Sequence, residues 1–316
     1  MGDMQRSGAL VAGILVLVVI AAVAAFLLLS GRDGDPPPSA SASSSASAVP
    51  SGTTPASLAA ELIDRPWTVL FIGVDSTEER RASGQPRNAD AILLVSVNAD
   101  GSRVSMVSLP RDTVDVSLPD GGTYPRKVNG LYAEAGPEGL TDAVATLYGV
   151  EIDGYLALDM DDFTGLVDAV GGVDVNPPAP LVDPIVDLDL AAGPQEIDAA
   201  TANGYVRTRV DQDYGRMRRQ QEVVVGVVER LLDPATDVDL RAVLDGLGSL
   251  ETDLPLAELP SLLEVARRAA DAPVERLLIE PPLITFEGDR GDGRGYILEP
   301  DVEAIRDAVG PLIDSE

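Results

Sequence analysis

Residues 68–73 read TVLFIG, residues 91–97 read AILLVSV, and residues 104–109 read VSMVSL. Each segment is short, mostly apolar and rich in β-branched side chains, a pattern typical of strands buried inside a domain. Residues 98–101 (NADG) follow the second segment, and their Asn, Asp and Gly favour a tight turn. The sequence therefore predicts a β-sheet as the first element of the fold, with a hairpin between its second and third strands.

Helical patterns alternate with strand patterns further along the chain. Residues 155–158 read as another strand, which lies between two of the predicted helices. The predicted helices span residues 139–148, 162–170, 220–232, 259–270 and 301–312. Because helices and strands interleave, we expect an α/β fold with three α-β-α layers around a central mixed sheet.

Two segments lack periodicity and are predicted to be loops. Residues 176–192 are rich in Pro and Asp, which indicates a long loop or flap, and such loops in compact domains are often functional. Residues 288–295 repeat Gly-Asp and Gly-Arg, a composition typical of a flexible surface loop.

The amino-terminal part of the chain predicts a membrane anchor. Residues 9–29 carry no charge and would span roughly 30 Å as a helix, at about 1.5 Å per residue. A cleaved signal peptide is the alternative, but Leu27 to Leu29 do not supply its small-residue exit. Residues 30–66 are rich in Ser, Ala and Pro, and we expect them to form a disordered linker. We expect residues 1–8 in the cytoplasm and residues 67–316 as one domain outside the cell membrane.

Composition excludes several classes of function. The chain has 52 acidic and 23 basic residues and a formal net charge of −29, so we expect no nucleic-acid partner. It contains neither cysteine nor histidine, which excludes disulfides, thiolate nucleophiles, Ser-His-Asp triads and zinc sites built from His or Cys. Acid–base chemistry and metal binding must therefore depend on Asp and Glu.

Arginines gather in one short segment of this acidic chain, at Arg207, Arg209, Arg216, Arg218 and Arg219. If residues 204–210 are extended, Arg207 and Arg209 point to the same face. If Arg216 begins a helix, Arg219 and Gln220 share its face. The arginine fork suits phosphate, so the spacing predicts an anion site, with Arg218 solvated off the shared face. The alternative is a set of surface salt bridges, which contribute about 0 to 1 kcal/mol each.

Two aspartates are candidates for holding a metal ion. Asp75 follows the first predicted strand directly, and Asp90 precedes the second. Adjacent strand ends would bring the two carboxylates together, and two carboxylates with substrate phosphates are a usual magnesium arrangement. The alternative is that each aspartate forms a turn at a strand end.

A further cation follows the third predicted strand. Arg111 lies in SLPRDT (residues 108–113), where Pro110 stiffens the strand exit, and strand exits in α/β sheets favour ligand binding. Lys127 in the next loop could add a positive charge, although a solvated lysine is the alternative.

These segments, in this order, resemble the LytR-CpsA-Psr family of bacterial cell-envelope proteins. The resemblance runs from about residue 68 to residue 232. It is carried by FIGVD (71–75), NADAILLVSV (88–97), SLPRDT (108–113), KVNGLY (127–132), DFTGLVDAVGGVDV (162–175), YVRTR (205–209) and GRMRRQQ (215–221).

The resemblance implies a phosphotransferase that moves a glycopolymer from a polyprenyl-pyrophosphate lipid onto peptidoglycan, with Mg²⁺ assisting and the lipid tail in an apolar tunnel. Asp75 and Asp90 would then hold the metal. The pyrophosphate would be bound by Arg111, Lys127, Arg207, Arg209, Arg216, Arg219 and Gln220. The residues expected to act in catalysis are Asp90, Arg111, Arg207 and Arg209, with Asp112 as a candidate base for the acceptor hydroxyl.

One position departs from the family pattern. The usual Arg-x-Asp is here Asn88-Ala89-Asp90, with an arginine displaced to Arg87. Either Arg87 reaches the site through a shifted backbone, or catalysis is weakened or differently tuned. Two alternatives to transfer therefore stay open: hydrolysis of the same lipid pyrophosphate, and a non-catalytic envelope protein that binds anionic wall polymer.

Overall fold

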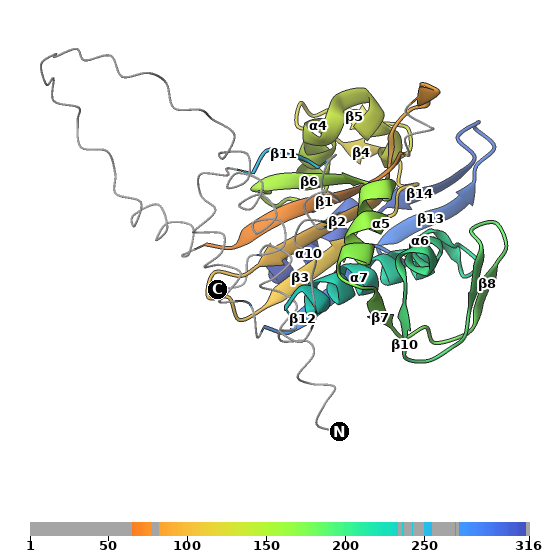
Figure 1. Ribbon diagram of the computed structural model, residues 1–316. Helices are drawn as coiled ribbons and strands as arrows, with labels where there is room; N and C mark the ends of the chain where they lie inside the picture. The colour runs from red at the N-terminus through yellow and green to blue at the C-terminus, as the bar shows by residue number, and fades with distance from the viewer. Residues whose placement is uncertain are drawn as a thin grey trace, which may run out of the picture.

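A computed structural model describes residues 65–76, 82–232, 236, 242, 250–254, 269 and 272–313. Its centre is a six-stranded sheet with the strand order β11-β6-β1-β2-β3-β12 (Figure 1). The strands are β1 (Trp67–Asp75), β2 (Asn88–Val97), β3 (Val104–Ser108), β6 (Gly154–Asp159), β11 (Glu251–Thr252) and β12 (Val274–Leu278). Strand β1 is antiparallel to β2 and parallel to β6, and β12 is parallel to β3, which confirms the predicted mixed sheet.

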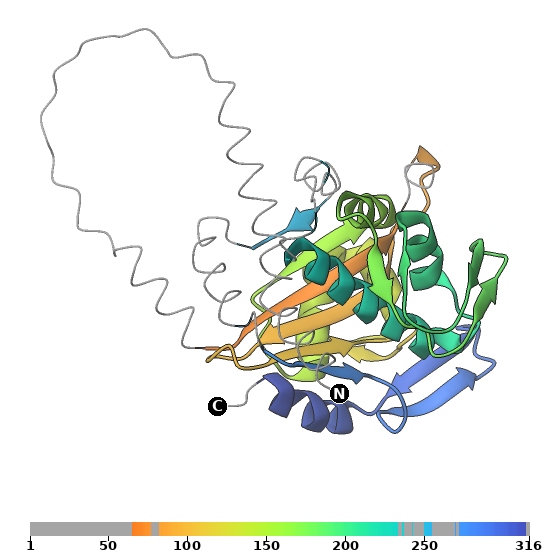
Figure 2. The same cartoon turned by 60° about the horizontal axis from the view of Figure 1, so that its bottom comes forward.

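Side chains alternate along the strands and so build a core on each face of the sheet. In β1, Leu70 and Ile72 face one core, while Trp67 and Val69 face the other. Helices α4 (Leu131–Tyr148) and α10 (Val302–Ile313) cover the first face. The second face packs against α5 (Met160–Ala169), α6 (Ala199–Arg207) and α7 (Gln212–Leu232). Figure 2 shows the sheet between α7 and α10, the three layers expected of an α/β fold.

Short two-stranded sheets accompany the central sheet within the described residues. They are β4 (Val116–Ser117) with β5 (Thr123–Tyr124), β7 (Val173–Val175) with β10 (Gln195–Ile197), β8 (Leu181–Asp183) with β9 (Leu188–Leu190), and β13 (Ile284–Asp289) with β14 (Tyr296–Pro300). The 3₁₀ turn η1 (Val128–Gly130) precedes α4. The prediction for residues 176–192 changes, because they contain the β8–β9 hairpin, whereas residues 288–295 mostly form the predicted loop, between β13 and β14.

The predicted helices differ from the observed ones chiefly in their starts. Helix α4 begins well before residue 139, with a break at Gly136, where φ is 72°. Helix α7 begins at Gln212, so its first turns contain the arginine segment. The prediction of an extended segment at 204–210 is wrong, because α6 runs to Arg207. Most of the helix predicted at 259–270 lies outside the described residues.

The predicted membrane anchor falls outside the described part of the chain. Residues 1–8, residues 9–29 and the linker up to residue 64 are not among the described residues. Of the helices that are described, none combines the length and the apolar character needed to cross a bilayer.

Candidate active site

Asp90 occupies a bulge in the sheet. In the β1–β2 ladder Gly73 faces Ala91 and Val74 faces Ala89, which leaves Asp90 as the extra residue. A bulge bends its strand and re-aims a side chain, and bulges are common next to active sites. The position of Asp90 therefore follows from an irregularity in the pairing of β1 and β2.

Two arginines converge on the carboxylate of Asp90. Arg111 Nη1 donates a hydrogen bond to Oδ2 of Asp90, and Arg216 Nη1 lies 3.8 Å from the same oxygen. Arg111 comes just after β3, where the carbonyl of Pro110 accepts hydrogen bonds from the backbone N–H and the hydroxyl of Thr113 (3.2 and 2.7 Å). The carboxylate thus joins strand β2, the exit of β3 and helix α7.

Arg216 is buried, with only 3% of its side chain exposed. Its Nη2 lies 2.9 Å from Oδ1 of Asp213, one turn earlier in α7, and Nε of Arg209 lies 3.5 Å from the same oxygen. Burial lowers the pKa of Arg216, while the negative charge of Asp213 acts in the opposite direction. Asp213 therefore helps to keep a cation in a place that excludes water.

Lys127 and Asp112 continue the row of charges beyond Arg111. Lys127 Nζ lies 3.0 Å from Oδ1 of Asp112, and Oδ2 of Asp112 lies 4.0 Å from Nε of Arg111. We call the whole set the ionic cluster: Lys127, Asp112, Arg111, Asp90, Arg216, Asp213 and Arg209. Its cations outnumber its carboxylates, although the chain has a net charge of −29. Locally, the cluster favours an anion.

The ionic cluster retains donors that an anion could use. Within the described residues, Nε of Arg111 and Nε of Arg216 are buried without a hydrogen-bond partner. A buried donor without a partner typically costs about 1–3 kcal/mol. Phosphate oxygens would accept from both guanidinium groups, whose planar forks match phosphate geometry. The two guanidinium groups therefore have the chemistry to bind a phosphate-bearing ligand.

The ionic cluster opens into a pocket of about 450 Å³, which we call the polar pocket. Its lining comprises Arg111, Asp112, Lys127, Arg209, Gln212, Asp213, Tyr214, Glu287, Tyr296 and Leu298. Loops after β3, the start of α7 and the β13–β14 hairpin thus all contribute to it.

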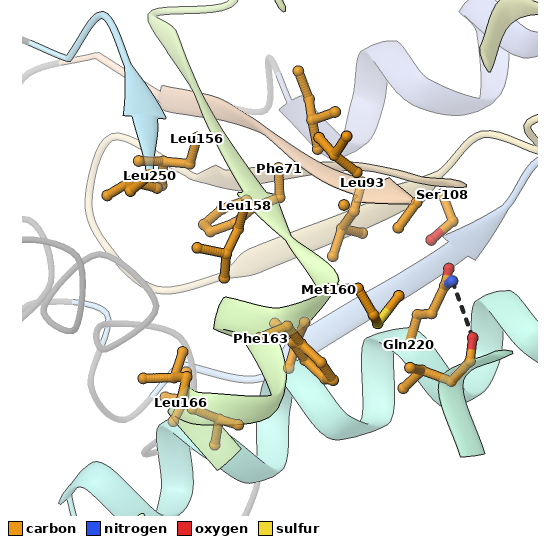
Figure 3. Close-up of a pocket in the computed structure, with 18 residues that line it drawn as sticks. Phe71, Leu93, Ser108, Leu156, Leu158, Met160, Phe163, Leu166, Gln220 and Leu250 are labelled. Atoms are coloured by element: carbon orange, nitrogen blue, oxygen red, sulfur yellow. Dashed lines mark hydrogen bonds between the residues drawn. The ribbon is translucent and has the colours of Figure 1, made fainter. Parts of the chain in front are cut away.

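A second cavity, the apolar pocket, lies between the sheet and helices α5, α6 and α7 (Figure 3). Its volume is about 150 Å³, and 18 residues line it, nearly all of them apolar. Leu156 and Leu250 lie at one end of the lining, while Ser108 and Gln220 lie at the other. Gln220 Nε2 donates to the carbonyl of Val206 (3.3 Å). The pocket has the character of a site for a hydrocarbon chain.

The two pockets follow one another along α7. Asp213 lines the polar pocket, Gln220 and Val224 line the apolar pocket, and Arg216 lies between them in the helix. The exit of β3 repeats this order, with Ser108 in the apolar pocket and Arg111 in the polar one. Along both α7 and the exit of β3, residues of the ionic cluster therefore neighbour those of the apolar pocket, an order that suits an amphipathic ligand.

The structure brings together Asp90, Arg111, Lys127, Arg209 and Arg216 from the predicted site. Asp75 ends β1 opposite Asn88, beside the bulge.

Three residues that were predicted to bind the pyrophosphate lie outside the ionic cluster: Arg207, Gln220 and Arg219. Arg207 is exposed at the end of α6, and its Nη1 donates to Oδ1 of Asn203 (3.5 Å). The predicted alternation with Arg209 fails because a helix, not a strand, carries Arg207. Gln220 faces the apolar pocket.

Arg219 has a structural environment instead of a place in the ionic cluster. It is 5% exposed, and its nitrogens donate to the carbonyls of Tyr205 (2.8 Å) and Thr208 (2.6 Å) and to the carboxylate of Asp211. These contacts hold the turn between α6 and α7. Arg218 is 57% exposed and pairs with Glu280, on the solvated side of α7.

Arg87 does not replace the arginine missing at Asn88. Its guanidinium donates to Asp159 (3.1 Å) and Glu251 (2.7 Å) and lies over the ring of Tyr132 (5.5 Å). These partners belong to β6, β11 and α4, so Arg87 links these three elements through contacts that lie outside the ionic cluster. The shifted-backbone alternative is therefore wrong.

Some residues of the site were not predicted from the sequence. Asp213 was given no role, although its spacing to Arg209 and Arg216, i−4 and i+3, is that of helical ion pairs. Glu287 and Tyr296 were missed because the strands that carry them, on either side of the predicted loop, were not predicted, and nothing in the local pattern shows that this hairpin returns to Arg111.

Comparisons with known proteins agree with this fold. The "LytR_cpsA_psr family" model matches residues 39–299. The "Probable cell wall biosynthesis protein LcpB" of Corynebacterium glutamicum is 35% identical over 58% of this chain, and the match spans only 46% of that relative. The "Polyisoprenyl-teichoic acid--peptidoglycan teichoic acid transferase TagU" of Halalkalibacterium halodurans is 32% identical over 76% of each chain.

The fold also matches a solved structure. The crystal structure of Bacillus subtilis TagV superimposes with a TM-score of 0.63, covers 79% of this chain and 98% of that chain, and is 21% identical in sequence. At that identity the superposition supports the architecture alone, whereas the family model covers the ionic cluster and both pockets. The chain belongs to the LytR-CpsA-Psr family.

Proposed function

We propose that this chain is a phosphotransferase that moves a glycopolymer from a polyprenyl-pyrophosphate carrier onto peptidoglycan through a phosphodiester link. The observation that carries the proposal is the group Asp90, Arg111 and Arg216, which the chain places between residues that line the polar pocket and residues that line the apolar pocket. A buried anion site next to a hydrocarbon cavity suits a diphosphate with a long apolar tail. The name of the TagU relative states a polyisoprenyl-linked donor and a peptidoglycan acceptor for that protein.

The chemistry assigned to this site is a displacement at phosphorus. An acceptor hydroxyl forms a new O–P bond at the glycan-bearing phosphate, and the P–O bond to the lipid phosphate breaks, so that polyprenyl phosphate leaves with the electron pair. The hydroxyl proton passes to a carboxylate, for which Asp112 in the polar pocket is a candidate. Arg111 and Arg216 stabilise charge on the phosphate oxygens without moving, which is the main source of catalysis in such reactions.

A magnesium ion fits the donor set only in part. Within the described residues no group of three or more Asp or Glu side chains could hold a metal by itself. Both arginines approach the same oxygen of Asp90, Oδ2, so Oδ1 and the carboxylate of Asp75 are the proposed protein ligands. Magnesium commonly takes one or two carboxylates and completes its shell with water and substrate phosphates. When bound, it would neutralise phosphate charge.

Asp75→Asn is expected to raise the magnesium concentration required for half-maximal transfer by about tenfold or more, because one of two protein ligands loses its charge. The measurement is the transfer rate against Mg²⁺ concentration, after treatment with a chelator. Asp142→Asn, an exposed change on α4, is the matched control and should behave as the wild type. An unchanged requirement in Asp75→Asn would remove Asp75 from the proposed site.

We further propose that the chain is anchored in the cell membrane by residues 9–29, with its amino terminus in the cytoplasm and residues 67–316 outside. The apolar character of residues 9–29 supports this arrangement. It would hold the site on the side of the membrane where peptidoglycan is assembled.

The proposed function is tested with the full chain, a defined polyprenyl-pyrophosphate glycan, nascent peptidoglycan and Mg²⁺. We expect two products, glycan joined to peptidoglycan through a phosphodiester and free polyprenyl phosphate. Free glycan phosphate in place of the joined product would indicate hydrolysis by water at the same site. Binding of donor without any product would indicate a non-catalytic envelope protein. Either outcome would overturn transfer as the function.

A further inference from the structure

The polar pocket has a second wall that carries no cation. On this wall Tyr214 Oη donates to Oε2 of Glu287 (3.2 Å), and Tyr296 Oη donates to Oε1 of the same carboxylate. The lysine and the arginines that line the pocket belong to the ionic cluster. We call Tyr214, Glu287 and Tyr296 the tyrosine wall. Its function is not explained by binding of a diphosphate, because the Glu287 carboxylate repels phosphate.

The tyrosine wall has the chemistry of a site for a neutral, hydroxyl-rich ligand. Burial, followed by the hydrogen bond to Glu287, raises the pKa of Tyr296 to about 12, so its phenol stays protonated and directed at Glu287. The phenol oxygens and the carboxylate then offer acceptors to ligand O–H and N–H groups. Tyr296 is 49% exposed, and its ring can present an apolar face beside these acceptors. Sugar rings combine both kinds of surface.

Backbone contacts fix the tyrosine wall relative to the ionic cluster. The N–H of Leu298, in β14, donates to the carbonyl of Asp112 (3.1 Å), and the N–H of Val114 donates to the carbonyl of Leu298 (2.9 Å). Thr113 and Leu298 also form an isolated parallel bridge. The hairpin that carries Glu287 and Tyr296 is therefore tied to the segment that carries Arg111. A ligand on the wall would be held at a set position relative to the phosphates.

The in-line geometry of phosphoryl transfer indicates whether the acceptor sugar or the donor sugar would occupy the tyrosine wall. In phosphoryl transfer the attacking and leaving oxygens lie roughly in line with phosphorus. The leaving oxygen belongs to the lipid phosphate, whose tail extends into the apolar pocket on the Gln220 side of Arg216. The nucleophile must then approach from the opposite side, which is the side of Asp213 and the polar pocket.

We propose that the tyrosine wall is the acceptor subsite, which holds an N-acetyl sugar of the peptidoglycan strand with one hydroxyl directed at the phosphates beside Arg111. This inference rests on the proposed function. It assigns to the β13–β14 hairpin, distant in sequence from the arginine segment, the choice of acceptor.

Tyr296→Ala and Glu287→Ala are expected to raise the KM for a soluble, uncrosslinked peptidoglycan strand by about tenfold each, with the KM for the lipid donor unchanged. Loss of a stacking face or of a two-hydrogen-bond acceptor is of this order, since a tenfold change corresponds to about 1.4 kcal/mol. Thr285→Ala is the matched control, an exposed change in the same hairpin outside the pocket, and should leave both constants unchanged. Thermal midpoints verify that the hairpin remains folded.

Direct binding separates this inference from the proposed function. Calorimetric titration of the same peptidoglycan strand into the full chain, without donor, should show weaker binding to Tyr296→Ala and Glu287→Ala than to the wild type. If that difference is found while the wild type produces no transfer, the sugar subsite stands and the proposed function fails. An unchanged acceptor KM in both variants overturns the subsite. A rise in the donor KM alone also overturns it, because the wall would then hold the donor glycan.

Discussion

Replacement of Arg216 by alanine is expected to reduce the rate of transfer by about two to three orders of magnitude, the loss typical when one preorganised donor to a developing charge is removed. Arg216 is the buried cation of the ionic cluster, with 3% of its side chain exposed, and in α7 it comes between residues that line the polar pocket and residues that line the apolar pocket. A solvent-exposed arginine could be replaced functionally by water or salt ions. A buried one could not.

The alanine variant also leaves carboxylates without their partner. Asp213 and Asp90 both face Arg216, and removal of one member of a buried ion pair typically costs about 3–5 kcal/mol of stability. Arg216→Lys separates folding from catalysis, because it keeps the charge and loses the planar fork that binds two phosphate oxygens. We expect the lysine variant to fold with a thermal midpoint near that of the wild type and still to lose at least about tenfold in kcat.

The matched control is Arg218→Ala, two residues further along the same helix. Arg218 is 57% exposed and pairs with Glu280, so its loss should change the rate by less than about twofold. Rates are measured with a lipid-pyrophosphate donor at saturating Mg²⁺. Full activity in Arg216→Lys, or an equal loss in Arg218→Ala, would contradict the assignment of the buried arginine.

The sheet could be predicted from the sequence because its signals are local. Residues 68–73 and 91–97 are buried on both faces of the sheet and therefore read as continuous apolar runs. The convergence of Asp90 and Arg111 also follows from such patterns, since both lie at strand ends of neighbouring strands. The bulge that re-aims Asp90 could not be predicted from local patterns, because it depends on how β1 pairs with β2.

The segment around Arg207 shows why local pattern failed there. Residues 205–209 (YVRTR) place the β-branched Val206 and Thr208 between a tyrosine and two arginines with period two, which favours a strand. In the structure Tyr205 and Val206 are buried side by side, which a helix packed on a core allows and a half-exposed strand does not. The start of α6 does have a local sequence signal, because Asp is a common N-cap residue. In the structure Asp198 is this N-cap and accepts a hydrogen bond from the N–H of Thr201 (2.8 Å).

The prediction that Arg219 binds the pyrophosphate failed for a different reason. Its spacing from Arg216 places both on neighbouring positions of one helix face, as predicted. The carbonyls of Tyr205 and Thr208 lie close to that face because α6 turns back onto α7, and they take up the Arg219 guanidinium. Helical periodicity identifies which residues share a face, but the chain that packs against the face decides their partners.

Filling the apolar pocket is expected to discriminate between donors by the length of their lipid. Val224 lines this pocket on α7, one turn beyond Gln220, so Val224→Phe would place a ring in the space of about 150 Å³ that we assign to the lipid. Burial of each methylene contributes about 0.8 kcal/mol, so excluding four of them costs about 3 kcal/mol, or roughly a hundredfold in kcat/KM. A donor with a truncated lipid that ends before the pocket should lose little.

The comparison of two donors is therefore the measurement, and Val224→Ala is the matched control. The alanine variant enlarges the pocket, and its preference for the long donor should equal or exceed that of the wild type. Added bulk in a packed core can destabilise a protein by about 1–3 kcal/mol, so thermal midpoints accompany the kinetics. A folding defect would lower the rates with both donors equally, whereas a blocked lipid site lowers the rate with the long donor alone. Equal kcat/KM for the long donor in wild type and Val224→Phe would show that the lipid does not enter this pocket.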